Sequence, residues 1–346
     1  MKVIVASTDV PFVGGGGTTA IVDWLGLELI RAGHDVDTLR FPFVSETTAM
    51  LDQALALRLF HVHDTADRVI CIRPPSYLLQ HPRKVLWFIH HHRPIYDLWH
   101  TEFRDVPDTP WGWRHARALV RADEVAFAEA RAVFANSHVV ADRLRRFNNV
   151  SAEVVYPPIH EPERFRCDGY GDYVMYVARA AEHKRQTLAV QAMRLTRTPV
   201  KLRLVGQADT ELYGLELQAM IDRHDLGDRV TFTNTWTSEA AKIDGLAGCL
   251  AALYIPLDED SYGYSSLEAH HARKAVITAT DSGGTSELIV NGENGLIVPP
   301  EPRALAEAMD RLYEDRALAQ RLGEAGPAAI ERLGITWDRV LERLLA

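Results

Sequence analysis

The fold class of this chain is indicated most strongly by the stretch Asp260-Ser-Tyr-Gly263-Tyr264-Ser265-Ser-Leu-Glu268-Ala. It follows a short apolar pattern typical of a buried strand, residues 251–255, and runs into a helical pattern at 265–272. The first amides of a helix lack intrahelical partners and carry partial positive charge, which makes them a site for anions. Gly263 has no Cβ, so a ligand can approach the backbone closely there. The stretch therefore predicts a strand–loop–helix unit that binds an anionic group.

Two carboxylates flank this loop. Glu268 lies about one turn into the predicted helix, where it is well placed to accept hydrogen bonds from a ribose diol. Asp260 precedes the turn and is placed to hold hydroxyls of a sugar attached to the phosphate. The spacing is equally compatible with a second interpretation, in which Asp260 caps a turn and Glu268 is solvated.

Strand and helix patterns alternate along the rest of the chain. In the second half, strands are predicted at 173–177, 201–205, 230–233, 251–255, 275–279 and 295–298, and helices at 184–193, 212–224 and 265–272. In the first half, strands are predicted at 3–6, 36–39, 69–72, 85–89 and 133–135, and helices at 18–32 and 113–131. Alternation of this kind predicts parallel, doubly wound sheets.

A pair of prolines divides the two halves. Val154-Val155-Tyr156-Pro157-Pro158 forbids a helix and suits a linker. The length of 346 residues also exceeds that of one typical core. We therefore predict an α/β protein with two Rossmann-like domains, residues 1–160 and 161–334. Two such domains in tandem predict a ligand cleft at the carboxyl ends of both sheets.

Composition narrows the class of protein. Hydrophobic residues make up 47% of the chain and charged residues 25%, as in an ordinary globular protein. A formal net charge of −9 argues against a nucleic-acid binder, whose affinity comes from a basic surface. Cys71, Cys167 and Cys249 form no CxxC pair, which favours a reducing cytoplasm over disulfides or a thiolate zinc site. No apolar run approaches the ~20 residues of a membrane span, so a contact with the inner face of a membrane is expected to be peripheral.

A second candidate element is Tyr176-Val177-Ala178-Arg179-Ala-Ala-Glu-His-Lys184. Arg179 follows the first predicted strand of the second domain, and Lys184 begins the next predicted helix. Two cations at a strand end suit a diphosphate, because arginine offers a planar fork and lysine a point charge. Solvated Arg and Lys are common on protein surfaces, and that is the alternative interpretation.

These elements together resemble a known family. Residues 172–330 resemble the C-terminal domain of the family-four (group 1) retaining glycosyltransferases of the GT-B fold. That family has Gly-Arg-x4-Lys after a strand, a Val-Gly strand end, Glu-x7-Glu around Phe-Gly, a Gly-x-Pro-Val-Ile strand, a Gly-Gly-x-x-Glu loop and Asn-Gly-x-x-Gly-Leu-x-Val. The matching positions here are Arg179 and Lys184, Val205-Gly206, Asp260-x7-Glu268 around Tyr262-Gly263, 273–277, 283–287 and 291–298. Their order and spacing agree over about half of the chain.

The first half is similar to the same family more loosely. Pro11 with Gly14–Gly17, and Gly33-His34-Asp35-Val36 after a helix, match the family's glycine loop and Gly-His-x-Val turn. Ala135-Asn136-Ser137 matches a strand end, and the proline pair matches the linker. The resemblance implies that a terminal helix, within residues 335–346, crosses back to the first domain.

The resemblance also implies roles for the matched residues. Arg179 and Lys184 would neutralise the donor diphosphate, and Glu268 would bind the ribose hydroxyls. The Gly263-Tyr264 amides would meet phosphate or sugar, with Ser265 and Gly206 in the same donor site. Gly16 and Gly17 would form a loop that meets the donor phosphate. A kinase-type phosphate loop is not indicated, because Thr18 follows without a lysine.

One position departs from the family pattern. Asp260 stands where the family usually has Glu, and one methylene less shortens its reach by about 1.5 Å. Either the sugar lies deeper, or the neighbouring Glu259 takes over the role. The sequence leaves both readings open.

His90 ends the strand predicted at 85–89 and is followed by His91 and His92. In related enzymes a histidine at this strand end faces the reacting sugar from the acceptor side, so His90 is a candidate catalytic residue. Three adjacent histidines also suggest a metal, but neighbouring strand residues point to opposite faces. The resemblance to GT-B enzymes also implies that the chemistry needs no metal, so we expect no metal and no cofactor. The alternative for His90 is a structural histidine bonded to backbone.

A basic face is predicted on the helix at 113–131. Arg114, Arg117 and Arg121 share one side of it by spacing, with Trp111 and Trp113 nearby. Such a face suits anionic lipid or a glycan; an ordinary solvated helix face is the other interpretation.

The predicted reaction is transfer of a hexose-type sugar from a UDP- or GDP-sugar to a hydroxyl of a glycan, lipid-linked or small-molecule acceptor, in polysaccharide or glycoconjugate biosynthesis. Retention of the anomeric configuration is implied by the resemblance alone. Two alternatives stay open at this point: a sugar-nucleotide epimerase or hydrolase of the same fold, and a non-catalytic sugar-nucleotide-binding paralogue.

Overall fold

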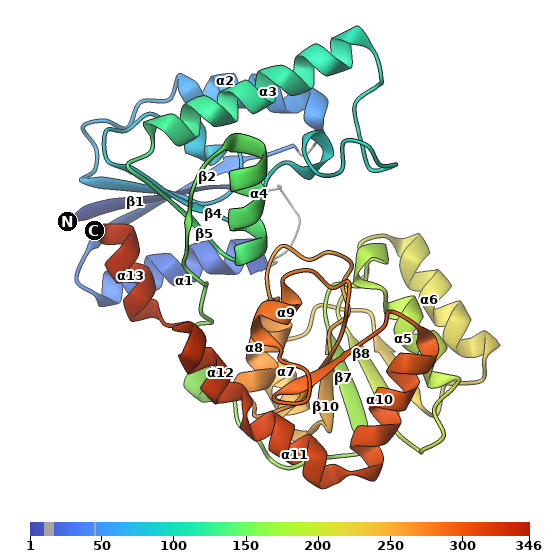
Figure 1. Ribbon diagram of the computed structural model, residues 1–346. Helices are drawn as coiled ribbons and strands as arrows, with labels where there is room; N and C mark the ends of the chain where they lie inside the picture. The colour runs from blue at the N-terminus through green and yellow to red at the C-terminus, as the bar shows by residue number, and fades with distance from the viewer. Residues whose placement is uncertain (10–16, 45) are drawn as a thin grey trace. The chain divides into compact units, whose positions relative to one another are not determined.

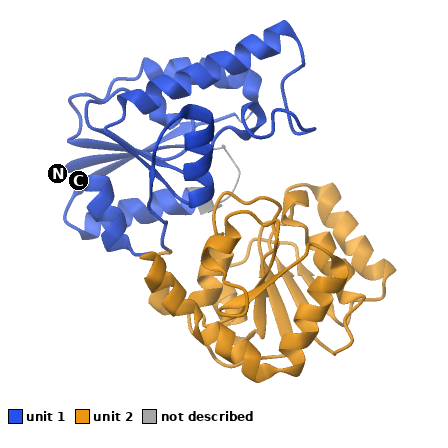
Figure 2. Ribbon diagram, viewed as in Figure 1, with its two compact units in different colours: residues 1–158, 335–346 blue, residues 159–334 orange. Residues whose placement is uncertain are grey.

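The computed structural model describes residues 1–9, 17–44 and 46–346. Two compact units share the chain (Figure 2). Unit 1 is Met1–Pro158 with Ile335–Ala346, and unit 2 is Ile159–Gly334. Each unit holds one six-stranded sheet in which all described pairings are parallel. Two Rossmann-like units with parallel sheets were predicted from the alternation of patterns, and this prediction is confirmed.

The sheet of unit 1 has the strand order β2-β1-β3-β4-β5-β6, with α2 and α3 on one face and α1 and α13 on the other (Figure 1). Its elements are β1 (Lys2–Asp9), α1 (Gly17–Arg31), β2 (Asp35–Pro42), α2 (Thr47–Arg58), β3 (Arg68–Cys71), η1 (Ser76–Leu78), β4 (Lys84–Phe88), η2 (Arg93–Ile95), α3 (Pro110–Glu129), β5 (Ala132–Ala135), α4 (His138–Asn148), β6 (Glu153–Val154) and α13 (Trp337–Leu345). The central strands β3 and β4 are buried along their whole length. A strand that is covered on both faces does not alternate apolar and polar residues. This explains why the sequence of these strands is a short, nearly continuous apolar run.

The sheet of unit 2 has the order β12-β11-β10-β7-β8-β9. Its elements are η3 (Pro162–Arg164), β7 (Tyr173–Val177), η4 (Glu182–Lys184), α5 (Gln186–Met193), β8 (Lys201–Val205), α6 (Glu211–Arg223), β9 (Val230–Thr233), α7 (Glu239–Gly248), β10 (Ala251–Leu253), α8 (Tyr264–His271), β11 (Val276–Ala279), α9 (Thr285–Leu288), β12 (Gly295–Val298), α10 (Pro302–Glu314), α11 (Arg316–Glu324) and α12 (Gly326–Leu333). Central β10 and β11 are fully buried, whereas β8, next to the edge, alternates buried leucines with exposed Lys201 and Arg203. Because all strands run the same way, their carboxyl ends share one edge of the sheet.

Some boundaries differ from the sequence-based prediction. Helix α3 begins at Pro110, three residues earlier than predicted, because the Thr109 side chain accepts from the amide of Gly112 and proline suits the first turn. The helix predicted from Lys184 is split into η4 and α5 at Arg185, whose φ of 56° is left-handed. Helix α2 was not predicted.

The last helix, α13, packs on unit 1. The buried guanidinium of Arg68 on β3 donates to the carbonyls of Leu344 (2.8 Å) and Ala346 (3.0 Å). Trp337 packs edge-to-face on Trp87 of β4, with ring centroids 6.4 Å apart. These contacts hold the helix across the sheet at its middle strands.

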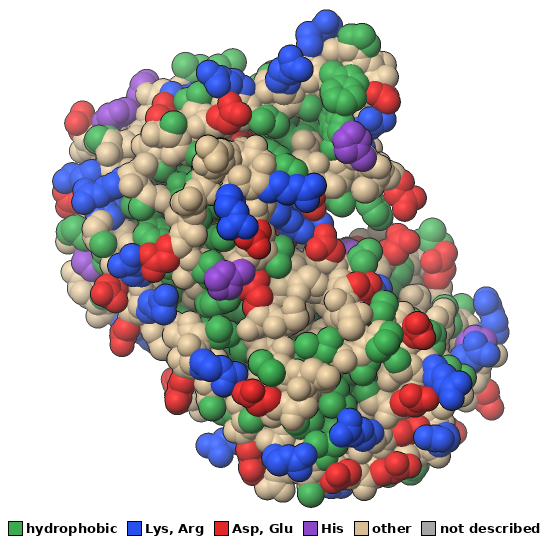
Figure 3. Space-filling view, in the orientation of Figure 1, with side chains coloured by type: hydrophobic (Ala, Val, Ile, Leu, Met, Phe, Trp, Pro, Cys, Tyr) green, Lys and Arg blue, Asp and Glu red, His purple; other side chains and the backbone are tan. Residues whose placement is uncertain are grey.

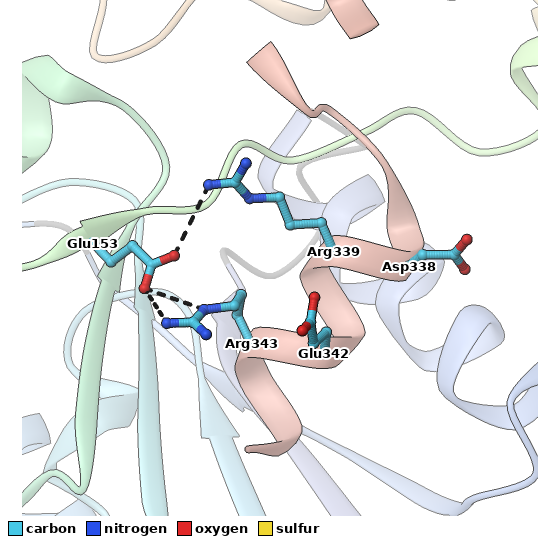
Figure 4. Close-up of a pocket in the computed structure, with 5 residues that line it drawn as sticks. All are labelled: Glu153, Asp338, Arg339, Glu342 and Arg343. Atoms are coloured by element: carbon cyan, nitrogen blue, oxygen red, sulfur yellow. Dashed lines mark hydrogen bonds and ion pairs between the residues drawn. The ribbon is translucent and has the colours of Figure 1, made fainter. Parts of the chain in front are cut away.

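Charged side chains of α13 line a surface hollow of about 650 Å³ (Figure 4). Arg343 and Arg339 both reach Glu153 of β6, and Arg343 Nε donates to its carboxylate at 3.1 Å. Asp338 and Glu342 complete the lining. Both arginines have an acidic partner on β6, so these ion pairs attach α13 to the edge of the sheet.

A buried carboxylate organises the core between η1 and α3. Asp123 accepts from the hydroxyls of Tyr77 (2.8 Å) and Tyr96 (2.7 Å), and Asn148 donates to the Tyr96 hydroxyl at 3.3 Å. Burial raises the pKa of Asp123 to about 6, although the two tyrosine hydroxyls oppose the shift. The folded protein therefore binds this proton more tightly than the unfolded chain does.

The stability of the fold should depend on pH through Asp123. A carboxyl whose pKa is raised by folding contributes less to stability as pH rises through the interval between its unfolded and folded pKa values. Asp123→Asn removes this titration. Relative to wild type, the free energy of unfolding of the variant should therefore rise by about 2 kcal/mol between pH 4 and pH 7. Urea denaturation at each pH measures the difference, and a difference that stays constant with pH would contradict the assignment.

Candidate functional site

The predicted donor-site residues of unit 2 lie at the carboxyl edge of its sheet. Arg179 and Lys184 follow β7, Gly206 follows β8, and residues 254–263 connect β10 to α8. Since β7, β8 and β10 are parallel and β10 and β8 both flank β7, these loops meet at one place. The structure therefore brings these residues together in one site.

Lys184 lies against Tyr254 and Glu259. Its ammonium donates to the Tyr254 hydroxyl at 3.0 Å and also to the Glu259 carboxylate. The same hydroxyl donates to Glu259 Oε2 at 3.0 Å. Burial by itself raises the pKa of Glu259, but the Lys184 charge outweighs it and the pKa lies below its usual range. The Glu259 carboxyl is therefore held in its ionised form.

This pair bears on the two readings of the acidic loop. Glu259 is the acidic residue that pairs with Lys184, the lysine predicted for the diphosphate. Asp260 is half-buried in the next position of the loop. The structure thus gives Glu259 a partner in Lys184, and the choice between Glu259 and Asp260 for the sugar hydroxyls stays a prediction.

Arg179 is the more accessible cation of the predicted clamp. Its side chain is 56% exposed, and its Nε lies 2.8 Å from Asp209 Oδ1. The buried Gln186 holds the loop beneath it by donating to the Arg179 carbonyl at 3.0 Å. The backbone is thus fixed while the guanidinium can reach a ligand.

Two glycines allow the loops to approach closely. Gly206 has φ of +144°, and a Cβ there would lie 2.0 Å from the Ala178 carbonyl oxygen. Gly263 has φ of +73°, and a Cβ there would lie 2.2 Å from the Tyr254 ring. Gly263 immediately precedes α8, as predicted. Any side chain at Gly263 would displace the tyrosine that contacts Lys184.

Helix α8 is tied to the neighbouring strand and carries the second carboxylate. The Ser265 hydroxyl donates to the Val177 carbonyl at 2.5 Å, which fixes the first turn of α8, just after Tyr264, beside the end of β7. Glu268 is 4% exposed, so the interpretation of a solvated residue is wrong. Its Oε1 accepts from the Lys242 ammonium of α7 at 2.5 Å. Burial raises the pKa of Glu268, and Lys242 opposes the shift.

Arg185 fastens the loops after three strands, a role that the sequence analysis missed. Its guanidinium donates to the carbonyls of Ile255 (2.7 Å) and Pro256 (2.8 Å) and to both carboxylate oxygens of Asp281 (2.7 and 2.8 Å). It thereby joins the loop after β7 to those after β10 and β11. Lys184 therefore sits on a braced segment. No local spacing signals this role, because the partners are far apart in sequence.

The three histidines after β4 of unit 1 have different surroundings. His91 is buried and donates from Nε2 to the Asn148 side-chain oxygen at 2.8 Å. His92 Nε2 lies 2.5 Å from the Thr47 hydroxyl, which donates to Asp105. Burial lowers the pKa of both rings to about 4, so both are neutral near pH 7. These contacts anchor the segment that carries His90.

His90 is half-buried, and its Nδ1 lies 2.8 Å from the His91 carbonyl oxygen. A carbonyl only accepts, so Nδ1 carries the proton and Nε2 of the neutral ring is an acceptor. In the part of the chain that the structure describes, no three His, Cys, Asp or Glu side chains are grouped as a metal site. His90 belongs to unit 1 and the donor-site residues to unit 2.

Two further predicted positions are Gly16 and Gly17. Gly17 is the first residue of helix α1, and Gly16 lies outside the described residues.

The basic face predicted on α3 is exposed: Arg114, Arg117 and Arg121 all face solvent, and Arg121 pairs with Glu124 at 3.0 Å. Basic and acidic side chains are interspersed over the face in view (Figure 3), so no single sign of charge dominates it.

Comparison with solved structures defines the class of fold. The Anabaena protein HepE, in complex with UDP and glucose, matches with a TM-score of 0.71 at 18% identity, over 99% of both chains. Sucrose-phosphate synthase of Thermosynechococcus elongatus matches with a TM-score of 0.75 at 18% identity, over 99% of this chain and 97% of the other. At these identities the likeness concerns the fold, which is GT-B.

Sequence comparison defines the family. Residues 162–329 match the model of "Glycosyl transferases group 1". Human alpha-1,3/1,6-mannosyltransferase ALG2 is 25% identical over 305 residues, 79% of this chain and 71% of ALG2. Alpha-D-kanosaminyltransferase of Streptomyces kanamyceticus is 26% identical over 285 residues, 79% of this chain and 68% of that protein. Residues 162–329 are thus a group 1 glycosyltransferase domain, and the protein is a transferase. Across the described ranges, no helix has the length and apolar character needed to cross a membrane.

The two cations after β7 give the first test of the site. Arg179→Ala and Lys184→Ala should each lower turnover about 100-fold or more, because a charge that stabilises a leaving group is worth several kcal/mol in a transition state. Lys201→Ala is the matched control: this lysine lies at the opposite end of β8 and should keep near-wild-type activity. Circular dichroism would verify folding. Near-normal turnover in both test variants would place the donor site elsewhere.

Proposed function

We propose that this glycosyltransferase moves a hexose-type sugar from a UDP- or GDP-sugar to a hydroxyl of a glycan, lipid-linked or small-molecule acceptor, with retention of the anomeric configuration. The observation that carries the proposal is the carboxyl edge of the unit 2 sheet, where Arg179 and Lys184 follow β7 and the buried Glu268 lies in the neighbouring helix α8. A nucleotide sugar presents the matching groups, namely a diphosphate for the cations and a ribose diol for the carboxylate.

The proposed chemistry is leaving-group stabilisation. Arg179 and Lys184 balance the negative charge that develops on the diphosphate as the glycosidic bond breaks. Asp260 orients the sugar through its hydroxyls, and Gly263 with Tyr264 brings backbone amides to the phosphate. The acceptor hydroxyl attacks from the side of the leaving group, whose phosphate oxygen takes the proton. Binding both partners in this geometry supplies much of the rate.

Support for a nucleotide-sugar donor also comes from relatives. HepE was solved with UDP and glucose, and ALG2 is named as a mannosyltransferase.

We place the reaction in the cytoplasm. The exposed Trp111, Trp113 and Arg117 of α3 form the surface we propose for contact with a membrane-bound acceptor, for which co-sedimentation with anionic vesicles is the measurement.

A donor panel tests the reaction. UDP-, GDP-, ADP- and dTDP-sugars are screened by thermal shift, where a donor at about 100 times its Kd stabilises by about 2.7 kcal/mol. The binding donor is then incubated with candidate acceptors in EDTA, and the anomeric configuration of the product is read by NMR. Product formed in EDTA with retention is expected. Inversion, a requirement for Mn²⁺, or consumption of donor without any acceptor would each contradict part of the proposal.

His90 is proposed to act on the acceptor side. Its anchored segment and an acceptor Nε2 suit a contact with a substrate hydroxyl. His90→Ala should lower turnover at least tenfold, while the Kd of the donor measured without acceptor stays within about twofold of wild type, because general acid–base contacts contribute in the transition state. The exposed His61→Ala serves as the matched control. Loss of donor affinity with unchanged turnover would reverse the assignment.

A further inference from the structure

Helices α7 and α8 are joined by an ion pair that the resemblance to the family did not indicate. Lys242 Nζ lies 2.5 Å from Glu268 Oε1, and the two side chains are only 16% and 5% exposed. Surface ion pairs contribute little and are screened by salt, whereas a buried pair constrains both groups strongly. A lysine inserted this deeply beside the predicted ribose carboxylate therefore calls for a functional account.

The carboxylate of Glu268 depends on this lysine for its charge. The titratable groups that face it are Lys242 and Glu239 from α7 and Tyr264 from its own helix. Burial raises the pKa of Glu268, Lys242 lowers it, and Glu239 raises it again. Burial and the Glu268 charge raise the pKa of the Tyr264 phenol, so this group stays neutral. Lys242 is therefore the one cation among these described groups.

Lys242 itself does not depend on Glu268 alone. Its ammonium also lies 2.9 Å from Glu239, whose side chain is 45% exposed. Burial disfavours the ammonium, but the charges of Glu268 and Glu239 outweigh it, and the pKa of Lys242 lies above its usual value. The lysine thus stays charged when a ligand engages Glu268. Because Lys242 occupies Oε1, Oε2 is the oxygen left to accept from a ligand hydroxyl.

We propose that Lys242 is a positioning residue that keeps Glu268 ionised and oriented as the acceptor for the ribose hydroxyls of the donor. This inference rests on the proposed function, in which Glu268 binds the ribose. A carboxylate accepts two hydroxyl hydrogens better than a neutral carboxyl, because hydrogen bonds to an ionised acceptor are roughly twice as strong. Lys242 thereby sets the pH range over which the nucleotide binds.

The consequence of removing the lysine has a definite sign. Without its ammonium the pKa of Glu268 rises further, because neither Glu239 nor Tyr264 supplies a positive charge that opposes the effect of burial. The carboxyl takes up a proton as pH falls, and affinity for the nucleotide is lost with it. Affinity returns as pH rises and the carboxylate re-forms. A role of Lys242 in packing alone would weaken binding equally at every pH.

The experiment measures binding of UDP and of GDP by titration calorimetry at pH 6.0, 7.0 and 8.5, using whichever binds wild type more tightly. The variants are Lys242→Met, Lys242→Gln and Lys242→Arg, with Glu239→Gln as the control that keeps the Lys242–Glu268 pair. Each result is expressed as the ratio of the variant Kd to the wild-type Kd at the same pH. Ionisation of the nucleotide phosphate then cancels.

We expect Lys242→Met and Lys242→Gln to bind at least tenfold more weakly than wild type at pH 6.0, with the ratio falling at least threefold by pH 8.5. Lys242→Arg should restore most of the affinity, and Glu239→Gln should stay within about twofold of wild type. Using two neutral variants guards against a folding defect in one of them. A ratio near one, or a ratio that is independent of pH in both, would overturn the inference.

Glu268→Gln separates this inference from the proposed function. An amide does not ionise, so this variant should bind more weakly than wild type at every pH, and its ratio should not fall between pH 6.0 and pH 8.5. If it binds as wild type does, Glu268 does not hold the ribose and the proposed function of this site fails. If it binds weakly while the neutral Lys242 variants follow wild type at every pH, the donor site stands and the role given to Lys242 is wrong.

Discussion

The parallel course of the strands in unit 2 is the constraint on which its site depends. Loops separated by up to about a hundred residues meet at one edge of the sheet. Four cations at this edge each form an ion pair with a carboxylate. These ion pairs are Arg179–Asp209, Lys184–Glu259, Arg185–Asp281 and Lys242–Glu268. Charges this close to a buried edge need partners, because desolvation is costly for an unpaired ion. In the function we propose, a diphosphate would bind by exchange and take the place of a carboxylate on a cation that is already positioned.

The four pairs differ in how readily they exchange. Arg179 is more than half exposed, and Lys184 lies in a half-buried pair beside Tyr254. Arg185 holds backbone carbonyls as well as Asp281, so releasing it would loosen the loops after β10 and β11. The Arg185–Asp281 pair, whose arginine also holds two loop carbonyls, thus suits the scaffold, and Arg179, the most exposed of the four cations, suits a ligand. The same edge combines a rigid frame with cations that can change partners.

The sequence predicted the two sheets because strands depend on local pattern, and it named candidate site residues from short motifs and from the resemblance to the family. Apolar runs of four or five residues identify β3, β4 and β11, and a glycine before a helix identifies the start of α8. Arg185, Tyr254 and Lys242 were missed because their roles depend on which loops meet. Lys242 lies in a helix of unremarkable spacing, and its partner Glu268 is 26 residues away. Helix α2 has a weak apolar pattern, and only its packing against α3 and η1 defines it.

The return of α13 to unit 1 has a consequence for how the chain is made. Arg68 and Trp87 of the first sheet receive their partners Leu344 and Trp337 only after all of unit 2 has been synthesised. A nascent chain can complete the packing of unit 2 before that of unit 1, although unit 1 emerges from the ribosome first. Until then the middle of the first sheet lacks its covering helix. During translation, unit 1 therefore completes its packing only when residues 335–346 have been synthesised.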